Sequence, residues 1–401
     1  GGKSMKKIII IKFGGSVLTD LDSIKSCVSL INEHLDKDFG IVIVVSALKG
    51  KTDNLVQLAK NHSPSLSPKQ FDAFISNGER ESAKLFVETL SNESLDPVLI
   101  DPDTSYWPII TDDMHLDANP LVPETESKCK SILLPMIENG SIPVVCGFIG
   151  KTKEDVITTL GRGGSDTTAV LLGASLDAVE VLLVKDVANV FTSDPNYVDD
   201  ALPLKSLTLR EASALSFGGA KFLHRKCLQY KSDNLRIRIL SIQSKESGTI
   251  IDGSQHNLSI GAFEENITMV TIIGVNYASY PSIGGLLSQF IEDDIHLLSL
   301  ALESDSLILY LYSQPGLLKK IHSYAIPNGF GKAISTHDDL SGLHITGPAL
   351  DTTKGLIQKI TAPLSEHQIN VYGIVTVSSS IQLYVSKNDI SKTIELLKSV
   401  I

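Results

Sequence analysis

Short apolar segments alternate with amphipathic ones along the first 245 residues of the chain. Several of the apolar segments have no polar position on either face, which is typical of strands in a mostly parallel sheet covered on both sides. Amphipathic stretches fall between them, so the pattern predicts an α/β domain over residues 5–245 in which helices sandwich the sheet. The predicted strands are Lys7–Ile11, Ile41–Ser46, Pro97–Ile100, Ile142–Phe148, Val179–Val184 and Arg236–Ser241.

The clearest helix signal runs from Pro68 to Leu90. Ser67 and Gln70 form a capping-box pattern, and Pro68 occupies the first helical position, where an N–H group has no intrahelical partner to lose. Apolar residues then recur at helical spacing. We therefore expect one continuous helix over residues 68–90.

The last third of the chain has a different pattern. Residues 246–266 are polar and rich in turn-forming residues, so we predict a linker there. The order βαββα(β) then occurs twice, and Gly285-Leu286 in the first copy corresponds to Gly355-Leu356 in the second. That order predicts two ferredoxin-like βαββαβ modules, over residues 267–336 and 337–401, each closed by its own last strand.

Composition and charge narrow the classes of function. Apolar residues make up 42% of the 401 residues and charged residues 20%, as in ordinary globular proteins. The longest apolar runs are strand-sized, and Ile8–Ile11 is too short for a secretory signal, so neither a membrane span nor export is expected. A net charge of −11 argues against nucleic acid or an anionic membrane as the main partner.

The four cysteines are Cys27, Cys129, Cys146 and Cys227, and their spacing is not that of metal ligands. Reduced, buried thiols are the simpler interpretation, which fits a cytoplasmic protein. We expect no metal to be bound by side chains directly.

The most informative segment is Gly161-Arg162-Gly163-Gly164-Ser165-Asp166-Thr167-Thr168, which lies between a predicted strand and a helix-like run. Its glycines let backbone N–H groups approach an anion closely. Ser165 or Asp166 is able to cap the helix that follows, whose N-terminus favours negative charge. Arg162 adds a planar fork suited to a carboxylate or a phosphate. The segment therefore predicts an anion-binding cradle.

A second glycine turn, Lys12-Phe13-Gly14-Gly15-Ser16, follows the first predicted strand. A plain tight turn would explain it, but a lysine between a strand and two glycines favours phosphate binding, although the segment is neither a Walker pattern nor a dinucleotide fingerprint. Two anion cradles at strand ends suit an enzyme that joins a nucleotide phosphate to a second anion. Further segments suit either a ligand contact or a simpler role. The simpler role is a polar loop for Ser46–Asn54, a solvated glutamate for Gly78-Glu79-Arg80, a surface turn for Lys185-Asp186-Val187 and Phe191–Asn196, and a helix stop for Gly218–Lys221.

Taken in order, these elements resemble the aspartate kinase branch of the amino acid kinase family. The resemblance covers nearly the whole chain, including the turn from Lys12, the Gly161 segment, the Asp194-Pro195 loop, the Gly-Ala-Lys sequence ending at Lys221 and a tandem ACT-type tail. It implies the amino acid kinase fold followed by two ACT modules. The implied activity is ATP-dependent phosphorylation of the L-aspartate β-carboxylate to 4-phospho-L-aspartate, the first step of lysine, threonine and methionine biosynthesis.

The resemblance also implies roles for individual residues. Lys12 and Asp166 are the implied catalytic residues, with Asp166 ordering the lysine or metal around it. ATP and Mg²⁺ are the implied cofactors. The implied ATP-binding residues are Lys12, Gly14, Gly15, Ser16, Lys185, Asp186, Phe191, Asp194, Asn196 and Lys221. The implied aspartate-binding residues are Ser46, Thr52, Glu79, Phe148, Arg162, Gly163, Gly164 and Ser165.

Several positions depart from the pattern of the family. Ser16-Val17 stands where Thr-Ser is usual, and Ala188-Asn189 stands where Asp-Gly is usual. Lys185 replaces a threonine, Phe191 a tyrosine and Asn196 an arginine. These positions lie in segments implied to bind the nucleotide, so we expect the aspartate pocket to follow the family pattern more closely than the nucleotide site does.

The implied reaction explains why no His–carboxylate dyad is evident. A β-carboxylate, whose pKa in water is about 3.9, is already an ionised nucleophile at neutral pH. Catalysis then consists of positioning and of charge stabilisation by lysines, backbone N–H groups and Mg²⁺. We expect Lys12 to neutralise charge on the transferring phosphoryl group, while Arg162 and Glu79 hold the α-carboxylate and the ammonium of the substrate.

Two other functions stay open at this point: a kinase for another small amino-acid carboxylate, and a catalytically weak amino-acid sensor. ACT-type modules resemble those that bind amino acids, so lysine or threonine is an expected effector, and a homodimer or larger assembly is expected. Dimerisation alone is the alternative role of the tail. The first module has Leu297-Leu298 where the lysine-sensing pattern has an acidic residue.

Overall fold

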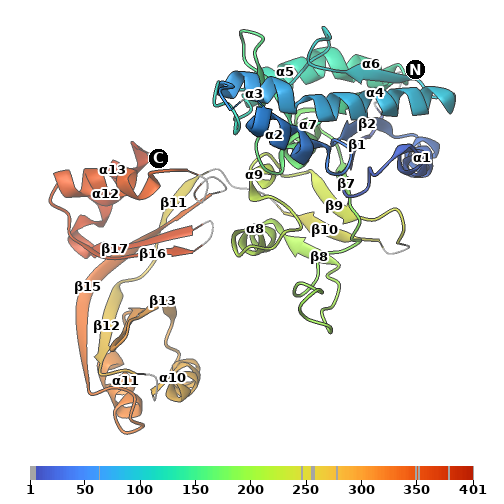
Figure 1. The fold of residues 1–401 in the computed structure, drawn as a ribbon. Helices are drawn as coiled ribbons and strands as arrows, with labels where there is room; N and C mark the ends of the chain where they lie inside the picture. Colours follow the sequence, from blue (N-terminus) through green and yellow to red (C-terminus); the bar gives the residue numbers. More distant parts are fainter. Residues whose placement is uncertain are drawn as a thin grey trace, which may run out of the picture. The chain divides into compact units, whose positions relative to one another are not determined.

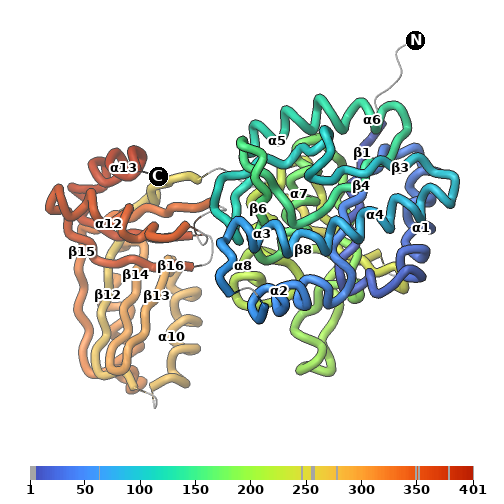
Figure 2. Tube along the Cα trace, turned by 45° about the horizontal axis from the view of Figure 1, so that its top comes forward, coloured from blue at the N-terminus to red at the C-terminus, as the bar shows by residue number. Residues whose placement is uncertain are grey.

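The computed structural model describes residues 6–62, 64–244, 247–253, 258–276, 279–347, 350, 353–377 and 380–400. The chain divides into two compact units, Gly1–Gln255 and His256–Ile401 (Figures 1 and 2). Residues 5, 245, 246 and 254–257, at the predicted domain ends and in the predicted linker, lie outside the described residues.

The first unit is built on an eight-stranded sheet (Figure 1). All neighbouring strands in it are parallel except β9 and β10, which run antiparallel. Every residue of β1 and β2 is buried, as the unbroken apolar pattern of these segments predicts for strands covered on both faces. The strands, in sheet order, are β3 (Pro97–Ile100), β4 (Ile142–Cys146), β2 (Gly40–Val45), β1 (Ile8–Phe13), β7 (Glu180–Val184), β9 (Arg236–Leu240), β10 (Thr249–Asp252) and β8 (Ser206–Thr208).

Helices lie on both faces of this sheet. The ring of Phe13 in β1 stacks on Phe86 of α4 (Asn77–Asn92), with centroids 5.3 Å apart, whereas the adjacent Lys12 pairs with Asp166 of α7 (Gly164–Ser175). Because neighbouring residues of a strand point to opposite faces, α4 and α7 lie on opposite sides of the sheet. The expected helix–sheet–helix fold is confirmed. The helices are α1 (Leu21–Asp36), α2 (Lys51–His62), α3 (Pro68–Ile75), α4 (Asn77–Asn92), α5 (Val122–Lys128), α6 (Leu134–Glu138), α7 (Gly164–Ser175), α8 (Leu209–Phe217) and α9 (Arg225–Leu228).

The helix expected over residues 68–90 is interrupted. The capping box of Ser67 and Gln70 is present, but α3 ends at Ile75 and α4 begins at Asn77. The hydroxyl of Ser76 donates to the carbonyl oxygen of Ala73, a local bond that competes with the regular helical pattern. The run Ser-Asn-Gly at this point consists of weak helix formers, so the sequence did carry a signal for the break.

The stretch predicted as a linker contributes a strand to each unit. Strand β10 joins the sheet of the first unit between β9 and β8, while β11 (Ser259–Ala262) pairs with β15 (Ala333–Thr346) in the second unit. Both strands are only four residues long, and their apolar alternation is too short to stand out from the surrounding turn residues.

The second unit contains one antiparallel sheet of seven strands (Figure 1). Each repeat has its own apolar core, and a third, smaller cluster that includes Leu340 contains residues of both repeats. The predicted pair of ferredoxin-like modules is confirmed as a fold class. The strands in sheet order are β13 (Leu297–Leu302), β14 (Ser306–Tyr312), β12 (Ile267–Ile273), β15 (Ala333–Thr346), β17 (Ser380–Ser386) and β16 (Val371–Val377), with β11 beside β15. The helices are α10 (Pro281–Glu292), α11 (Leu317–Ala325), α12 (Leu356–Glu366) and α13 (Ile390–Lys398).

Strand β15 belongs to both repeats. Its first part, up to Leu340, pairs with β12, and its second part, from Leu340 onward, pairs with β17 and β11. The predicted division between residues 336 and 337 therefore lies inside one continuous strand. The edge position of the second repeat is occupied by β11, which precedes the first repeat in the sequence, and this replaces the expected closing strand after α13.

Candidate active site

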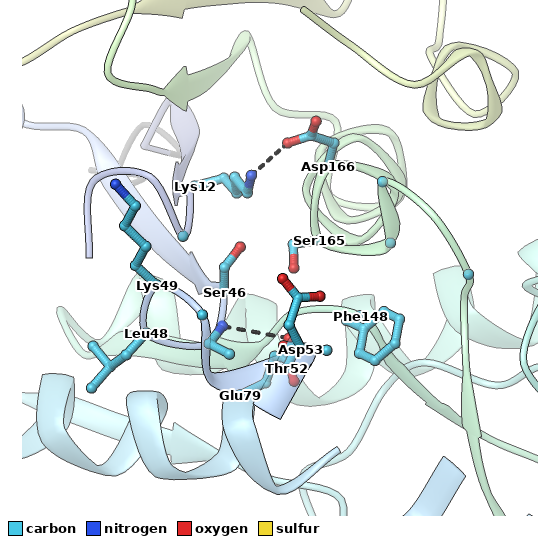
Figure 3. Close-up of a pocket in the computed structure, with 16 residues that line it drawn as sticks. Lys12, Ser46, Leu48, Lys49, Thr52, Asp53, Glu79, Phe148, Ser165 and Asp166 are labelled. Carbon is cyan, nitrogen blue, oxygen red and sulfur yellow. Dashed lines mark hydrogen bonds and ion pairs between the residues drawn. The ribbon is translucent and has the colours of Figure 1, made fainter. Parts of the chain in front are cut away.

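A cavity of about 340 Å³ lies where β1, β2 and β4 end in the first unit (Figure 3). Ligand sites of parallel α/β sheets are expected at this edge, because the carboxyl ends of the strands leave room for loops there. The cavity is lined by Lys12, Gly15, Ser46, Ala47, Leu48, Lys49, Gly50, Thr52, Asp53, Glu79, Phe148, Gly161, Gly163, Gly164, Ser165 and Asp166.

A buried ion pair stands at one end of the cavity. Lys12 Nζ lies 2.7 Å from Asp166 Oδ1, and each side chain is only 7% exposed (Figure 3). Lys185 Nζ lies 3.3 Å from the other carboxylate oxygen of Asp166. Burial alone would raise the pKa of Asp166, but the two lysines hold this pKa at about 2. Two cations around one carboxylate leave a positive excess, which suits an incoming anion.

The turn after β1 keeps backbone close to this pair. Gly14 N–H donates to the carbonyl oxygen of Val184 at 3.2 Å, which ties the turn to the end of β7. A Cβ atom on Gly14 would lie 3.3 Å from Lys12 Nζ, so a larger residue would crowd the ammonium. Gly15 lines the cavity, whereas Ser16 is exposed beside it. The turn therefore places the Lys12 ammonium next to backbone groups that no side chain covers.

Glu79 stands at the other end of the cavity, in the first turn of α4. It is 4% exposed, its Oε1 accepts a hydrogen bond from Ala47 N–H at 3.4 Å, and its Oε2 is buried without a partner (Figure 3). Burial raises the pKa of Glu79 to about 8. Gly78 allows this approach, because a Cβ atom there would meet Ala47 Cβ at 2.9 Å. An unpartnered buried carboxyl facing a cavity calls for a cationic ligand.

The third wall is the acceptor turn, which we define as residues 161–165. Gly161 and Gly163 have φ angles of 76° and 65°, a left-handed conformation that favours glycine. A Cβ atom on Gly164 would lie 2.6 Å from the ring of Phe148, so glycine is required there as well. Helix α7 begins at Gly164, and the first N–H groups of a helix are available to an anion.

The structure brings together most of the residues predicted to bind the acceptor. Ser46, Thr52, Glu79, Phe148, Gly163, Gly164 and Ser165 all line the cavity. Arg162 is exposed on the acceptor turn and is not among the lining residues. The predicted roles of these residues stay predictions, but their common location agrees with a shared ligand.

The residues predicted to bind the nucleotide are more dispersed. Lys185 reaches Asp166 and also donates to the carbonyl oxygen of Phe222. Phe191 is half-buried, and Asn196 donates from its backbone and its side chain to the Asp194 carboxylate, both at 2.9 Å. Asp186, Asp194, Asn196 and Lys221 are exposed.

Sequence reasoning missed some of the residues in the cavity wall. Lys49, Gly50 and Asp53 line the cavity and come from the segment Ser46–Asn54, from which only two residues were assigned a role. The turn before α2 was a signal for them, since it follows a strand of the same sheet. Among the described residues, no group of three or more His, Cys, Asp and Glu side chains is placed to hold a metal ion. No helix in the described part of the chain is long and apolar enough to span a bilayer.

Residues 7–241 match the amino acid kinase family as a whole. The chain belongs to the amino acid kinase family. Among its relatives, aspartokinase 2 of Bacillus subtilis (strain 168) is 30% identical over 405 aligned residues, which cover 97% of this chain and 96% of that protein. The aspartokinase of Geobacillus stearothermophilus is 34% identical over 276 residues, covering 67% of this chain and 66% of the relative. The resemblance that the motifs indicated is confirmed.

Solved structures of aspartokinases share the fold of this kinase. The E. coli aspartokinase III complex with aspartate and ADP has a TM-score of 0.58 at 22% identity and covers 98% of this chain and 100% of that one. The aspartate kinase of Synechocystis has a TM-score of 0.78 at 22% identity, covering 98% of this chain and 68% of that one. At this level of identity the likeness establishes the fold alone.

Proposed function

We propose that this chain is an aspartate kinase, which transfers the γ-phosphoryl group of ATP to the β-carboxylate of L-aspartate and forms 4-phospho-L-aspartate. The observation that carries the proposal is the composition of one cavity, with a buried carboxyl at one end and a lysine–aspartate pair at the other. A zwitterionic acceptor with an additional anionic side chain matches that arrangement. The relatives named above are aspartokinases, and E. coli aspartokinase III has been crystallised with aspartate and ADP.

The acceptor is oriented by opposite charges. The ammonium of aspartate pairs with Glu79, whose free Oε2 has no protein partner. The carboxylates lie against the N-terminal N–H groups of α7 and the hydroxyl groups of Thr52 and Ser165, all of which line the cavity. Arg162, which is exposed on the acceptor turn, binds the α-carboxylate through its guanidinium group when the substrate is present.

The transfer needs no proton acceptor on the enzyme. The β-carboxylate is ionised at neutral pH, so the barrier comes from repulsion between this carboxylate and the triphosphate. Lys12 and Lys185 lower that barrier by neutralising charge on the phosphoryl group, while Asp166 holds both ammonium groups in place. The substitution of lysine for the usual threonine at position 185 thus adds a cation on the nucleotide side.

Mg²⁺ accompanies the nucleotide in this proposal. Asp166 is engaged by two lysines, and the described residues contain no group of three or more His, Cys, Asp and Glu side chains placed to hold a metal ion, so the donor set fits a cation held mainly by phosphate oxygens and water. When bound, Mg²⁺ supplies further neutralisation of phosphate charge. The exposed residues Asp186, Asp194 and Lys221 complete the nucleotide site when ATP is present.

The second unit is proposed to regulate the first. E. coli aspartokinase III has been crystallised with lysine and aspartate, and lysine or threonine is the effector that we propose here. We also propose that the chain forms a homodimer or larger assembly through the second unit. A cytoplasmic location is in keeping with its four unpaired, buried cysteines. The reaction would then be the first step of lysine, threonine and methionine biosynthesis. Titrating each amino acid against activity tests the regulation, and a flat response to both contradicts it.

A trapping assay tests the activity itself. Hydroxylamine converts an acyl phosphate to a hydroxamate, so the purified chain with ATP and Mg²⁺ should form hydroxamate from L-aspartate. Glutamate and N-acetylglutamate serve as matched acceptors, and both should react poorly. The extra methylene group of glutamate displaces the reacting carboxylate, and the acetylated nitrogen of N-acetylglutamate has no charge to pair with Glu79. Preference for either of them, or no product from any acceptor, contradicts the proposal.

A further inference from the structure

Lys226 is a buried lysine that the reaction does not use directly. It belongs to the short helix α9, is 6% exposed, and is not among the residues that line the cavity. Its Nζ donates to the carbonyl oxygens of Leu160 at 2.8 Å and Ala118 at 2.9 Å, and pairs with Asp117 Oδ1 at 2.6 Å. An ammonium group has three hydrogens, so these three acceptors satisfy it completely.

These contacts lie directly behind the acceptor turn. Leu160 precedes Gly161 in the chain, and a Cβ atom on Gly161 would stand 2.6 Å from Asp117 Oδ1. A Cβ atom on Gly163 would lie 2.4 Å from His224 Cβ, which belongs to the residue before α9. Helix α9 and residues 117–118 therefore pack against the turn so closely that only glycine fits at these positions.

Backbone bonds link the same residues to the cavity wall. Ala118 N–H donates to the carbonyl oxygen of Thr159, and Leu160 N–H donates to that of Phe148, both at 2.9 Å. Phe148 itself lines the cavity. Removal of the Lys226 ammonium would leave two buried carbonyl oxygens without this donor, which is costly enough to shift the backbone that bears them.

We infer that Lys226 is a positioning residue for the acceptor turn: it holds Leu160 and residues 117–118 together so that the N-terminus of α7 meets the acceptor in a set geometry. The identity of the acceptor rests on the proposed function, whereas the effect on the turn does not. Lys226 acts through the acceptor turn, so its loss should weaken acceptor binding far more than nucleotide binding.

The decisive variant is Lys226→Met, which keeps the length of the side chain but removes its charge. The KM for aspartate should rise on the order of 10-fold to 100-fold, because a small displacement of positioning groups has effects of this size. The KM for ATP should stay within about twofold, because the Lys226 ammonium contacts none of the residues proposed to bind the nucleotide. Lys231→Met is the matched control, because Lys231 is also buried, at 4% exposure, and donates to the carbonyl oxygens of Ser232 and Gly253.

Hydrogen exchange separates the inference from the proposed activity. The amides of Gly161–Asp166 and of Ala118 should exchange faster in Lys226→Met than in Lys231→Met at matched global stability. Unchanged exchange, or equal rises of KM for both substrates, overturns the inference even if the wild type phosphorylates aspartate. If the wild type forms no aspartyl hydroxamate, the proposed function is wrong, but the exchange comparison still tests whether Lys226 positions the acceptor turn.

A milder variant covers the case in which Lys226→Met does not fold. Asp117 is 69% exposed at its side chain, so Asp117→Asn removes one charge from the contact without leaving a buried carbonyl unpaired. Its KM for aspartate should rise about threefold to tenfold, in keeping with the loss of a charged hydrogen bond. An unchanged KM in a folded Asp117→Asn enzyme overturns the inference.

Discussion

The two halves of the candidate site are constructed differently. On the acceptor side, Glu79 is 4% exposed, and the acceptor turn is packed so closely that its glycines have no room for side chains. On the predicted nucleotide side, Asp194, Asn196 and Lys221 are exposed. The fold therefore prepares the acceptor pocket in advance, whereas the exposed groups on the predicted nucleotide side stay hydrated until a ligand binds.

Because of this difference, substitutions in the two halves of the site should have effects of different size. Buried, preorganised charges act strongly because little water screens them, so their removal should affect turnover and acceptor binding by large factors. Exposed charges are screened by salt and cost little to rearrange, so their removal should change nucleotide affinity by small factors that depend on ionic strength. Variants in both halves of the site test this contrast, in order of decreasing effect.

The largest effect is expected from Lys12→Met. Loss of the buried cation removes charge stabilisation from the transferring phosphoryl group and leaves Asp166 with one lysine, so kcat should fall roughly 1,000-fold or more. Steady-state kinetics should show little change in the KM for aspartate. Lys60→Met is the control, because Lys60 is an exposed lysine of the same unit that does not line the cavity. Near-normal turnover of Lys12→Met would remove this lysine from the mechanism.

Glu79→Gln should mainly affect the acceptor. Without a carboxylate to pair with the ammonium, the KM for aspartate should rise roughly 100-fold, the scale expected for losing one partner of a buried charge pair. Glu81→Gln is the matched control on the same helix, because Glu81 is half-exposed and pairs with Lys51. If both variants behave alike, Glu79 does not hold the acceptor.

The raised pKa of Glu79 also gives a sign for the pH dependence of stability. The carboxyl is protonated in the folded empty site up to a pKa of about 8, against an ordinary value of 4.5, so its contribution to stability is complete below 4.5 and lost as pH rises through 8. Glu79→Gln stays neutral, so it should be more stable than the wild type above about pH 8 and equal to it below 4.5. Denaturant unfolding at several pH values measures this difference, and a parallel pH dependence of the two proteins would contradict it.

Lys185→Thr should have a smaller effect that is confined to the nucleotide. The variant removes one of the two cations around Asp166, so the KM for ATP should rise on the order of tenfold while the KM for aspartate changes little. Lys205→Thr, at an exposed lysine of the same unit, is the control. A larger effect on aspartate than on ATP would place Lys185 in the acceptor half instead.

The smallest effect is expected in the exposed loop. Asn196→Arg adds a cationic fork beside the proposed phosphates, so the KM for ATP should fall about twofold to fivefold at low salt, and less as salt screens the charge. Asn196→Gln, which adds no charge, is the control. A fall that persists at high ionic strength would show that this loop is as well ordered as the acceptor pocket.

The pattern of apolar residues and glycine turns predicted the sheet and the site at its edge, because both depend on residues that are close together in the sequence. Strand β1 is apolar at all positions except Lys12, and that exception, directly before Phe13 and two glycines, marks the site. The break at Ser76 could also be predicted from the sequence, because it falls in a run of weak helix formers.

Other features depend on contacts between distant residues. Lys226 is separated by 109 positions from Asp117, and nothing in its own neighbourhood distinguishes it from a surface lysine. Strands β10 and β11 are four residues each, so their pairing comes from the neighbouring strands and not from their own pattern. The exposure of Arg162 follows from the left-handed conformation of the glycines on either side of it, and the amino-acid composition does not reveal their φ angles.

The continuous strand β15 makes the two repeats of the second unit mechanically inseparable. Leu340, which is fully buried, is the residue at which pairing passes from β12 to β17. A slip of one position in either half would turn the core-facing side chains of both halves outward at once. Neither repeat can therefore change its strand register alone, and a small molecule that rearranged one of them would have to act on the other through fourteen residues of shared backbone.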